Sequence, residues 1–157
     1  MSSTEKTARE SHTTMTEYVL PTHANALGTV FGGQVLAWMD LCSAICAQRF
    51  AGSICVTAGI DDLSFDQSIL VGQVVRLEAT VTAAFGSSLE VFVDVRGEEP
   101  ASGRTWPCVS GYLTFVRLEG GRPAPVPALR CETDEQRRRQ EQAQARRRAR
   151  LARRAAP

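Results

Sequence analysis

The sequence of 157 residues lacks a long apolar run: no stretch reaches the roughly 18 uncharged apolar residues of a membrane helix. Its first 14 residues lack the apolar core of a secretory signal. Histidine is scarce, with two residues, and the five cysteines form no CxxC pair. These absences predict reduced thiols in a cytoplasmic protein, with no metal site and no stable membrane insertion.

The chain is long enough for one compact domain with its own core, because 43% of its residues are hydrophobic. The net charge of +1 conceals an asymmetry between body and ending. Residues 1–130 carry 9 basic and 13 acidic residues, whereas residues 131–157 carry 9 basic and 4 acidic residues. We therefore expect a mildly acidic domain followed by a basic tail.

The periodicity of apolar residues predicts an α+β fold. A short strand at residues 16–20 precedes a segment, residues 34–48, that is apolar almost all round and reads as a buried helix. Alternating patterns then predict strands near residues 54–65, 74–83, 89–96 and 105–118. This order predicts one curved antiparallel sheet packed on one long helix.

The two ends of the chain differ from the domain at residues 15–122. Residues 1–14 read as a disordered leader, and residues 123–131 form a proline-rich connector. Residues 132–157 are rich in arginine, with acids first and arginines last, which suits the dipole of a charged helix. Thr133 or Asp134 is its predicted cap, and we expect a solvated helix that packs on a neighbouring subunit.

A carboxylate interrupts the apolar helix. Asp40 is the one ionisable carboxylate from Gln34 to Ala47, and burying it unpaired would cost several kcal/mol. A role as general base or nucleophile explains its presence. From the helix pattern alone, an outward-facing side chain or a pair with Arg49 explains it equally well.

The loop before this helix offers hydrogen-bond donors. Gly32 and Gly33 allow close approach of the backbone and leave unpaired N–H groups, which can hold an oxyanion. Asn25 adds an amide that can donate to an oxyanion or orient a water molecule. Each feature alone is also typical of an ordinary turn.

Taken together, three segments resemble the acyl-CoA thioesterases (acyl-CoA hydrolases) of the hotdog superfamily, in the branch of bacterial YciA and brain acyl-CoA hydrolase. They are His23-Ala-Asn-Ala-Leu-Gly28, Phe31-Gly-Gly-Gln34 and Trp38-Met-Asp40. The resemblance implies a hotdog fold, in which a five- to six-stranded antiparallel sheet wraps a central helix. It also implies homo-oligomers of paired hotdogs, commonly hexameric trimers of dimers, with each active site between two subunits.

The implied reaction is hydrolysis of acyl-CoA to a fatty acid and CoA without a cofactor. Asp40 would act as general base or nucleophile, and Asn25 would orient water or the tetrahedral intermediate. The N–H groups of Gly32 and Gly33 would stabilise the oxyanion. The CoA moiety would lie against three residues, Gly86, Ser87 and Ser88. Phe85 and Gly86 stand where the family has glycine and arginine, so a cationic contact is missing from this segment.

Other functional classes stay open to different degrees. A non-catalytic acyl-CoA sensor or scaffold is the main alternative, because of the changes at residues 85 and 86. Hotdog dehydratases pair a histidine with a carboxylate, and neither His12 nor His23 lies in such a context. The arginine-rich ending lacks interleaved aromatic residues, so we expect no nucleic-acid partner.

Overall fold

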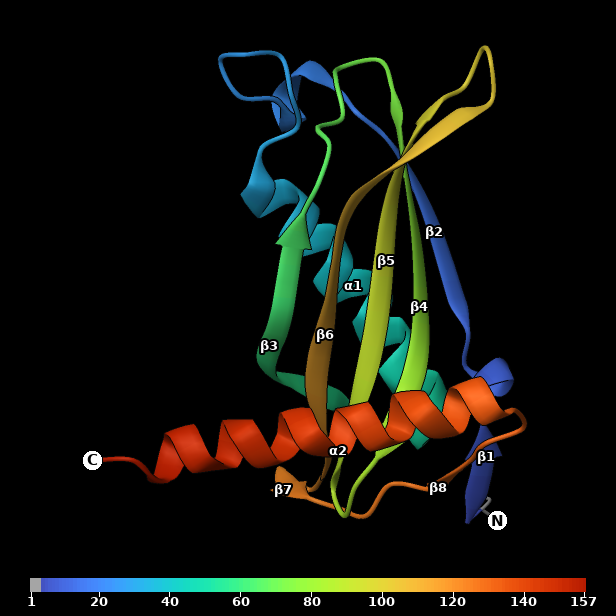
Figure 1. Ribbon diagram of the computed structural model, residues 1–157, viewed down its shortest axis with the longest axis vertical. Coiled ribbons are helices and arrows are strands. Elements are labelled where there is room, and N and C mark those ends of the chain that lie inside the picture. Colours follow the sequence, from blue (N-terminus) through green and yellow to red (C-terminus); the bar gives the residue numbers. More distant parts are fainter. Residues whose placement is uncertain (1–3) are drawn as a thin grey trace.

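The computed structural model describes residues 4–157. One antiparallel sheet curls around helix α1 (Gly32–Ala51), and a second long helix, α2 (Asp134–Ala155), crosses the opposite face of the sheet (Figure 1). This is the α+β architecture that the sequence predicts.

The main sheet has six strands, five of them in the order β2-β4-β5-β6-β3, with the short β7 paired to β6. Their bounds are β2 (Thr13–Tyr18), β3 (Cys55–Phe65), β4 (Val74–Ala84), β5 (Ser88–Glu99), β6 (Arg104–Glu119) and β7 (Arg122–Pro123). The predicted strands match these in order, and their ends differ by a few residues. Among the described residues, strand β3 pairs with β6 alone, so its other edge is open.

Alternation along the strands separates the two faces of the sheet. In β4 the side chains of Val75, Leu77 and Ala79 are buried in the core cluster with α1, whereas Arg76 and Glu78 are exposed. Side chains on a strand point alternately to opposite faces, so one face buries apolar area and the other stays polar. The polar face is the one that α2 crosses (Figure 1).

Helix α1 is less completely buried than its sequence predicts. It begins after Phe31 and ends at Gly52, whose φ of 67° lets its N–H bond to the Gln48 carbonyl oxygen at 2.8 Å. Its core face holds nine buried residues. On its other side, however, Leu41 is 56% exposed and Ile45 is 41% exposed. An apolar stripe of α1 is therefore left uncovered in the single chain.

Residues 4–14 are not a disordered leader, so that prediction is wrong. Strand β1 (Glu5–Thr7) runs parallel to β8 (Ala128–Arg130), and the 3₁₀ helix η1 (Ala8–Glu10) joins β1 to β2. Ala8 is buried, and the Glu10 carboxylate accepts hydrogen bonds from the N–H and hydroxyl of Thr7, which lowers the pKa of Glu10. The polar composition of this segment predicted disorder, because composition does not reveal such local hydrogen bonds. Residues 1–3 of the predicted leader lie outside the described residues.

Helix α2 packs on the sheet of its own chain, while most of its residues are exposed, as expected for a solvated helix; its packing on a neighbouring subunit stays a prediction. Its predicted cap is confirmed at Thr133, whose Oγ1 accepts from the Gln136 N–H at 3.1 Å. The connector before it is interrupted by β7 and β8. In residues 4–157 no helix is long and apolar enough to cross a membrane.

Arginines attach α2 to the sheet. Arg146 makes two hydrogen bonds to the carboxylate of Glu90 in β5, at 2.8 and 3.0 Å, and its guanidinium stacks 3.5 Å from the ring centroid of Tyr112. Further along, Arg150 and Arg153 both bond to Asp61 in β3. The basic tail therefore neutralises carboxylates of its own sheet.

Candidate active site

The N-terminus of α1 presents free donors, as the sequence predicts. Phe31 is the N-cap residue and makes no side-chain capping bond. Within residues 4–157, the N–H groups of Gly32 and Gly33 donate to no acceptor, because the first bonds of the helix start at Gln34. Two adjacent donors at the positive end of a helix can stabilise a developing oxyanion.

A small cavity lies beside these donors. It measures about 110 Å³ and is lined mainly by apolar or small side chains, Val30, Val35, Phe65, Ser68, Ile69 and Cys108 among them, together with Gly32. A side chain at Gly32 would lie 3.9 Å from the ring of Phe65, and one at Gly33 would lie 3.2 Å from the ring of Phe31. The two glycines therefore keep the approach to the helix N-terminus narrow but open.

Asp40 lies two turns into α1 and is half-buried at the side of the helix that faces β3. Thr57 Oγ1 in β3 donates to Asp40 Oδ1 at 2.6 Å. Arg49, the alternative partner, bonds instead to the His12 carbonyl oxygen and the Thr13 hydroxyl. Within residues 4–157 the carboxylate is thus held by one neutral donor, and its second oxygen remains available to a substrate or a water molecule.

Thr57 is a partner of Asp40 that the sequence analysis does not assign to the candidate site. It follows Val56 in an edge strand, where a threonine hydroxyl normally faces solvent, so the residue type does not indicate a contact with a carboxylate. A register shift in the pairing of β3 with β6 falls between Thr57 and Gly59. Such a bulge re-aims side chains at a strand edge. Periodicity does not reveal bulges, so the sequence offered no direct sign of this contact.

Asn25 lies in the loop before α1, and the structure does not join it to Asp40: in residues 4–157 no hydrogen bond links the two. Its Oδ1 accepts from the N–H groups of Leu27 and Thr29, and its Nδ2 donates to Thr29 Oγ1 at 2.7 Å. The side chain is exposed, and an amide nitrogen carries two hydrogens, so one N–H remains free.

His23 lies in the same loop before α1. It is half-buried, its Nδ1 accepts from the Leu20 N–H at 3.1 Å, and its ring packs edge-on against Trp38 at 4.9 Å between centroids. Its contacts fix the loop onto α1, which is a structural role.

The turn between β4 and β5, residues 85–88, lies at the other end of the sheet from the start of α1 (Figure 1). It is closed by a bond from the Phe85 N–H to the Ser88 carbonyl oxygen at 2.7 Å. Gly86 is exposed, and Ser87 and Ser88 are half-buried. Within one chain, the predicted CoA contacts and the predicted oxyanion donors therefore lie at opposite ends of the sheet.

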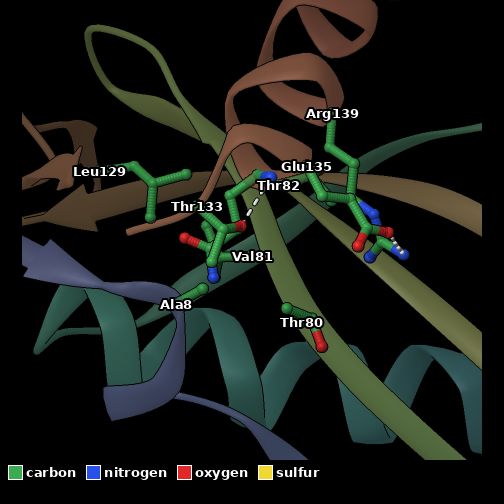
Figure 2. A pocket seen from close by; sticks show the side chains of 9 residues that line it. Ala8, Thr80, Val81, Thr82, Leu129, Thr133, Glu135 and Arg139 are labelled. Atoms are coloured by element: carbon green, nitrogen blue, oxygen red, sulfur yellow. Dashed lines mark hydrogen bonds and ion pairs between the residues drawn. The ribbon is translucent and has the colours of Figure 1, made fainter. Parts of the chain in front are cut away.

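A larger cavity of about 290 Å³ lies elsewhere, between β4, β8 and the first turn of α2, and contains none of these residues (Figure 2). Its charged wall residues, Glu135 and Arg139, are paired with each other at 3.1 Å. Thr82 donates to Glu90 beneath it. The charges are satisfied internally, so this cavity offers no reactive group.

Four of the five cysteine thiols are buried in the core. Burial raises the pKa of Cys42, Cys46, Cys55 and Cys108 to about 11. Neutral, buried thiols neither attack a thioester nor bind a metal at neutral pH. Cys42 and Cys46, one helical turn apart in α1, are therefore small core residues.

Known proteins share this fold. Residues 27–103 match the family described as the thioesterase superfamily. A hexameric acyl-CoA thioesterase of known structure is 38% identical and superposes with a TM-score of 0.91, over 98% of this chain and 99% of that chain. The acyl-CoA hydrolase of Staphylococcus aureus, solved with butyryl-CoA, CoA and CoA disulfide, is 34% identical with a TM-score of 0.88, over 96% and 92% of the two chains.

Relatives in sequence also include proteins named as acyl-CoA thioesterases or hydrolases. The acyl-CoA thioester hydrolase YkhA of Bacillus subtilis, described as uncharacterised, is 36% identical over 82% of this chain and 75% of its own length. Acyl-coenzyme A thioesterase 11 of Mus musculus is 44% identical over 65% of this chain. The matches span only 17–20% of the length of the mammalian relatives matched first.

A central helix wrapped by one antiparallel sheet is the hotdog fold, which this chain shares with the acyl-CoA thioesterases that superpose on it. The chain belongs to the thioesterase superfamily, in the group of the acyl-CoA hydrolases. The family resemblance and the hotdog fold that the sequence predicted are confirmed.

Proposed function

We propose that this protein hydrolyses acyl-CoA thioesters to a carboxylic acid and CoA. The observation that carries the proposal is the pairing of free N–H donors at Gly32 and Gly33 with a carboxylate, Asp40, held by Thr57. Relatives named as acyl-CoA hydrolases support the same reaction.

In the proposed reaction, the thioester carbonyl oxygen lies against the N–H groups of Gly32 and Gly33. In the general-base route, Asp40 takes a proton from a water molecule that adds to the acyl carbonyl carbon, and collapse of the tetrahedral intermediate breaks the C–S bond. In the nucleophilic route, Asp40 adds to the same carbon, breakage of the C–S bond leaves an acyl–aspartyl anhydride, and water then hydrolyses this anhydride at the aspartyl carbon. In both routes CoA leaves as a thiolate that takes up a proton. The donors act by stabilising negative charge that develops on the oxygen.

We further propose that each site combines two subunits. Asn25 and Asp40 are not in contact within one chain, and the free edge of β3 is flanked by exposed apolar side chains. These are Leu41 and Ile45 of α1, Ile54, and Val56, Ile60, Leu63 and Phe65 of β3. An apolar patch beside an unpaired strand fits a second copy of the chain. The hexameric relative supports a trimer of such dimers.

A two-fold axis at the β3 edge would also unite the remaining site residues. Such an axis pairs β3 with its copy in antiparallel fashion, so the partner is turned end over end. The partner's turn at residues 85–88 then lies toward the end where α1 begins. We propose that Gly86, Ser87 and Ser88 hold the CoA moiety there.

Residue spacing in a relative supports the catalytic set. The Staphylococcus aureus hydrolase was also solved with an asparagine, an aspartate or a threonine replaced by alanine. These three positions have the same intervals in sequence as Asn25, Asp40 and Thr57. Five free cysteines support the proposed cytoplasmic location.

The first test is thiol release from acyl-CoAs of increasing chain length by wild type, Asp40→Asn and a control, Asp62→Asn. Asp62 is an exposed aspartate of the same chain and tolerates asparagine, because its φ of 50° is favourable for that residue. We expect Asp40→Asn to lose at least about a hundredfold in kcat with its fold intact. Binding of acyl-CoA without thiol release by wild type would instead identify a sensor.

Mixing of variants tests the shared site. Asn25→Ala and Asp40→Ala homo-oligomers are each inactive, but hybrids regain one intact site per dimer. Equal mixing after dissociation should restore about a quarter of wild-type activity, as random pairing across a two-fold interface requires. A mixture that stays inactive although hybrids form would place both residues in one subunit's site.

A single turnover in ¹⁸O-water distinguishes the two roles of Asp40. General-base catalysis places the label in the released acid and leaves the protein unlabelled. Attack by Asp40, followed by hydrolysis of the anhydride at the aspartyl carbon, leaves ¹⁸O in the peptide that contains Asp40. Mass spectrometry of the product and of that peptide reads out both.

A further inference from the structure

The turn at residues 85–88 brings no charged side chain of its own to a nucleotide. CoA carries its negative charge on a diphosphate and a ribose phosphate, and proteins usually meet phosphates with arginine or lysine. At this turn Gly86, Ser87 and Ser88 offer backbone N–H groups and the two serine hydroxyls, but no cation. A cation has to come from another element.

Helix α2 contains nine arginines, and six of them bond to acceptors of the same chain. Their acceptors are Asp134 for Arg137, Glu135 for Arg139, Glu90 for Arg146, Asp61 for Arg150 and Arg153, and the Ala58 carbonyl oxygen for Arg154. The other three, Arg138, Arg147 and Arg148, have no such bond within residues 4–157.

Of these three, Arg147 is the one placed at the turn. Its guanidinium carbon lies 5.0 Å from the ring centroid of Phe85, and the side chain is half-buried. Arg138 lies near the start of α2 beside Arg139, and Arg148 is exposed. Stacking on an aromatic face fixes the guanidinium plane but leaves the N–H groups at its edge free to donate.

The other charges near the turn are already used. Arg117 donates its backbone N–H to the Ser87 carbonyl oxygen, and its side chain bonds to the Pro125 carbonyl oxygen and pairs with Glu119 at 3.6 Å. Glu119 is exposed. Within residues 4–157, Arg147 forms no ion pair with a carboxylate.

We propose that Arg147 binds a phosphate of CoA at this turn, held in place by Phe85. The inference rests on the proposed function, because it takes CoA as the ligand of the turn. Arg147 is then a specificity residue: it contacts the nucleotide end of the substrate and takes no part in breaking the thioester. The aromatic residue at position 85 thus positions a cation delivered by α2.

The test compares butyryl-CoA, butyryl-dephospho-CoA and butyryl-pantetheine as substrates of wild type, Arg147→Gln and the matched control Arg148→Gln. For Arg147→Gln we expect KM for butyryl-CoA to rise about tenfold or more at low salt, as for loss of a charge-assisted bond, with kcat unchanged. KM for butyryl-pantetheine should not change. Arg148→Gln should behave as wild type with all three.

A second variant tests whether the cation matters or merely the packing. A side chain at Gly86 meets no atom within 4 Å, and the backbone there is not left-handed, so arginine fits. We expect Arg147→Gln/Gly86→Arg to recover most of the lost affinity for butyryl-CoA. Equal KM increases for butyryl-pantetheine, or no recovery by Gly86→Arg, would overturn the assignment.

The dephospho substrate locates the contact. If Arg147 binds the ribose phosphate, wild type and Arg147→Gln should have equal KM for butyryl-dephospho-CoA; if it binds the diphosphate, the difference persists. Absence of hydrolysis of all three substrates would refute the proposed function alone. Calorimetric titration of CoA into wild type and Arg147→Gln would then decide the inference, since equal Kd values would refute it.

Discussion

Thr57 Oγ1 and Asp40 Oδ1 lie 2.6 Å apart, so that a hydroxyl of the edge strand holds a carboxylate of the central helix. Both residues border the uncovered face of the chain, formed by α1 and β3. The contact fixes the direction of the second carboxylate oxygen. A group that must meet a substrate carbon or a water molecule requires such fixed geometry.

Replacing Thr57 with valine removes this donor and keeps the shape of the side chain. We expect kcat for acyl-CoA hydrolysis to fall about tenfold or more, because a hydrogen bond to a charged group contributes about 1.5 to 3 kcal/mol. Thr57→Ser keeps the hydroxyl and should retain most of the activity. Steady-state kinetics of both variants, with circular dichroism to verify folding, checks this. Wild-type kcat in Thr57→Val would show that the contact does not serve the reaction.

Arg146→Met should destabilise the protein by about 3 to 5 kcal/mol, because it leaves the carboxylate of Glu90 buried without its charged partner. Glu90 is 1% exposed, which makes this carboxylate one of the most deeply buried charges in the chain. The control Arg138→Met changes an arginine without such a bond and should shift stability by less than about 0.5 kcal/mol. Urea unfolding measures both. A small effect of Arg146→Met would mean that α2 is not held by this pair.

The double variant Glu90→Leu/Arg146→Met provides a further check. Removing both charges eliminates the uncompensated carboxylate, so much of the stability lost in Arg146→Met should return. The result would show that the cost arises from the unpaired charge and not from the loss of packing on Tyr112.

Gly97→Ala should unfold or strongly destabilise the protein. A side-chain carbon at Gly97 would lie 2.3 Å from the indole ring of Trp106, which is buried and bonded through Nε1 to the Ser68 carbonyl oxygen at 3.1 Å. Overpacking of this kind costs about 1 to 3 kcal/mol or more. Gly86→Ala, which meets open space, is the matched control. A melting temperature equal to that of wild type for Gly97→Ala would contradict the packing described.

Stability should decrease as pH rises from about 9 toward 11. Burial raises the pKa of Cys42, Cys46, Cys55 and Cys108 from 9.0 to about 11, so the unfolded chain loses these protons first. Each such thiol lowers the free energy of unfolding by about 1.4 kcal/mol per pH unit in that window. Unfolding of wild type and Cys46→Ala at pH 8 to 10.5 measures the slope, which should be shallower in the variant. Equal slopes would show that Cys46 ionises normally in the fold.

The fold was readable from the sequence where periodicity is strong. Strands such as β4 alternate over their whole length, and the apolar run after Gly33 is uninterrupted, so their existence and order followed directly. The first residues were misread, because in η1 and β1 the stabilising contacts are side-chain bonds to nearby backbone and a parallel pairing with β8. Pairing between residues 5 and 128 is non-local and leaves no pattern in the sequence.

The site was readable in part for a related reason. Gly32, Gly33 and Asp40 stand out as glycines at a helix start and a carboxylate in an apolar helix, but each feature alone also fits an ordinary structural role, and the resemblance to the hotdog thioesterases made them candidates. Thr57 was not assigned to the site, since a threonine in a strand is ordinary and the direction of its side chain depends on a bulge. Arg147 was hidden among nine arginines, and its neighbour Phe85 lies 62 positions earlier in the chain.

Helix α2 crosses strands that precede it in the chain, and this order has a consequence for synthesis. Glu90 and Asp61 leave the ribosome well before Arg146 and Arg150 do. Until then the nascent sheet displays two carboxylates without counter-ions. Strand β3, which carries Thr57, lacks the bonds that α2 makes to Asp61. Helix α2, which is translated after β3, therefore completes the edge that is proposed to receive a second subunit, which would delay assembly until each chain has closed on itself.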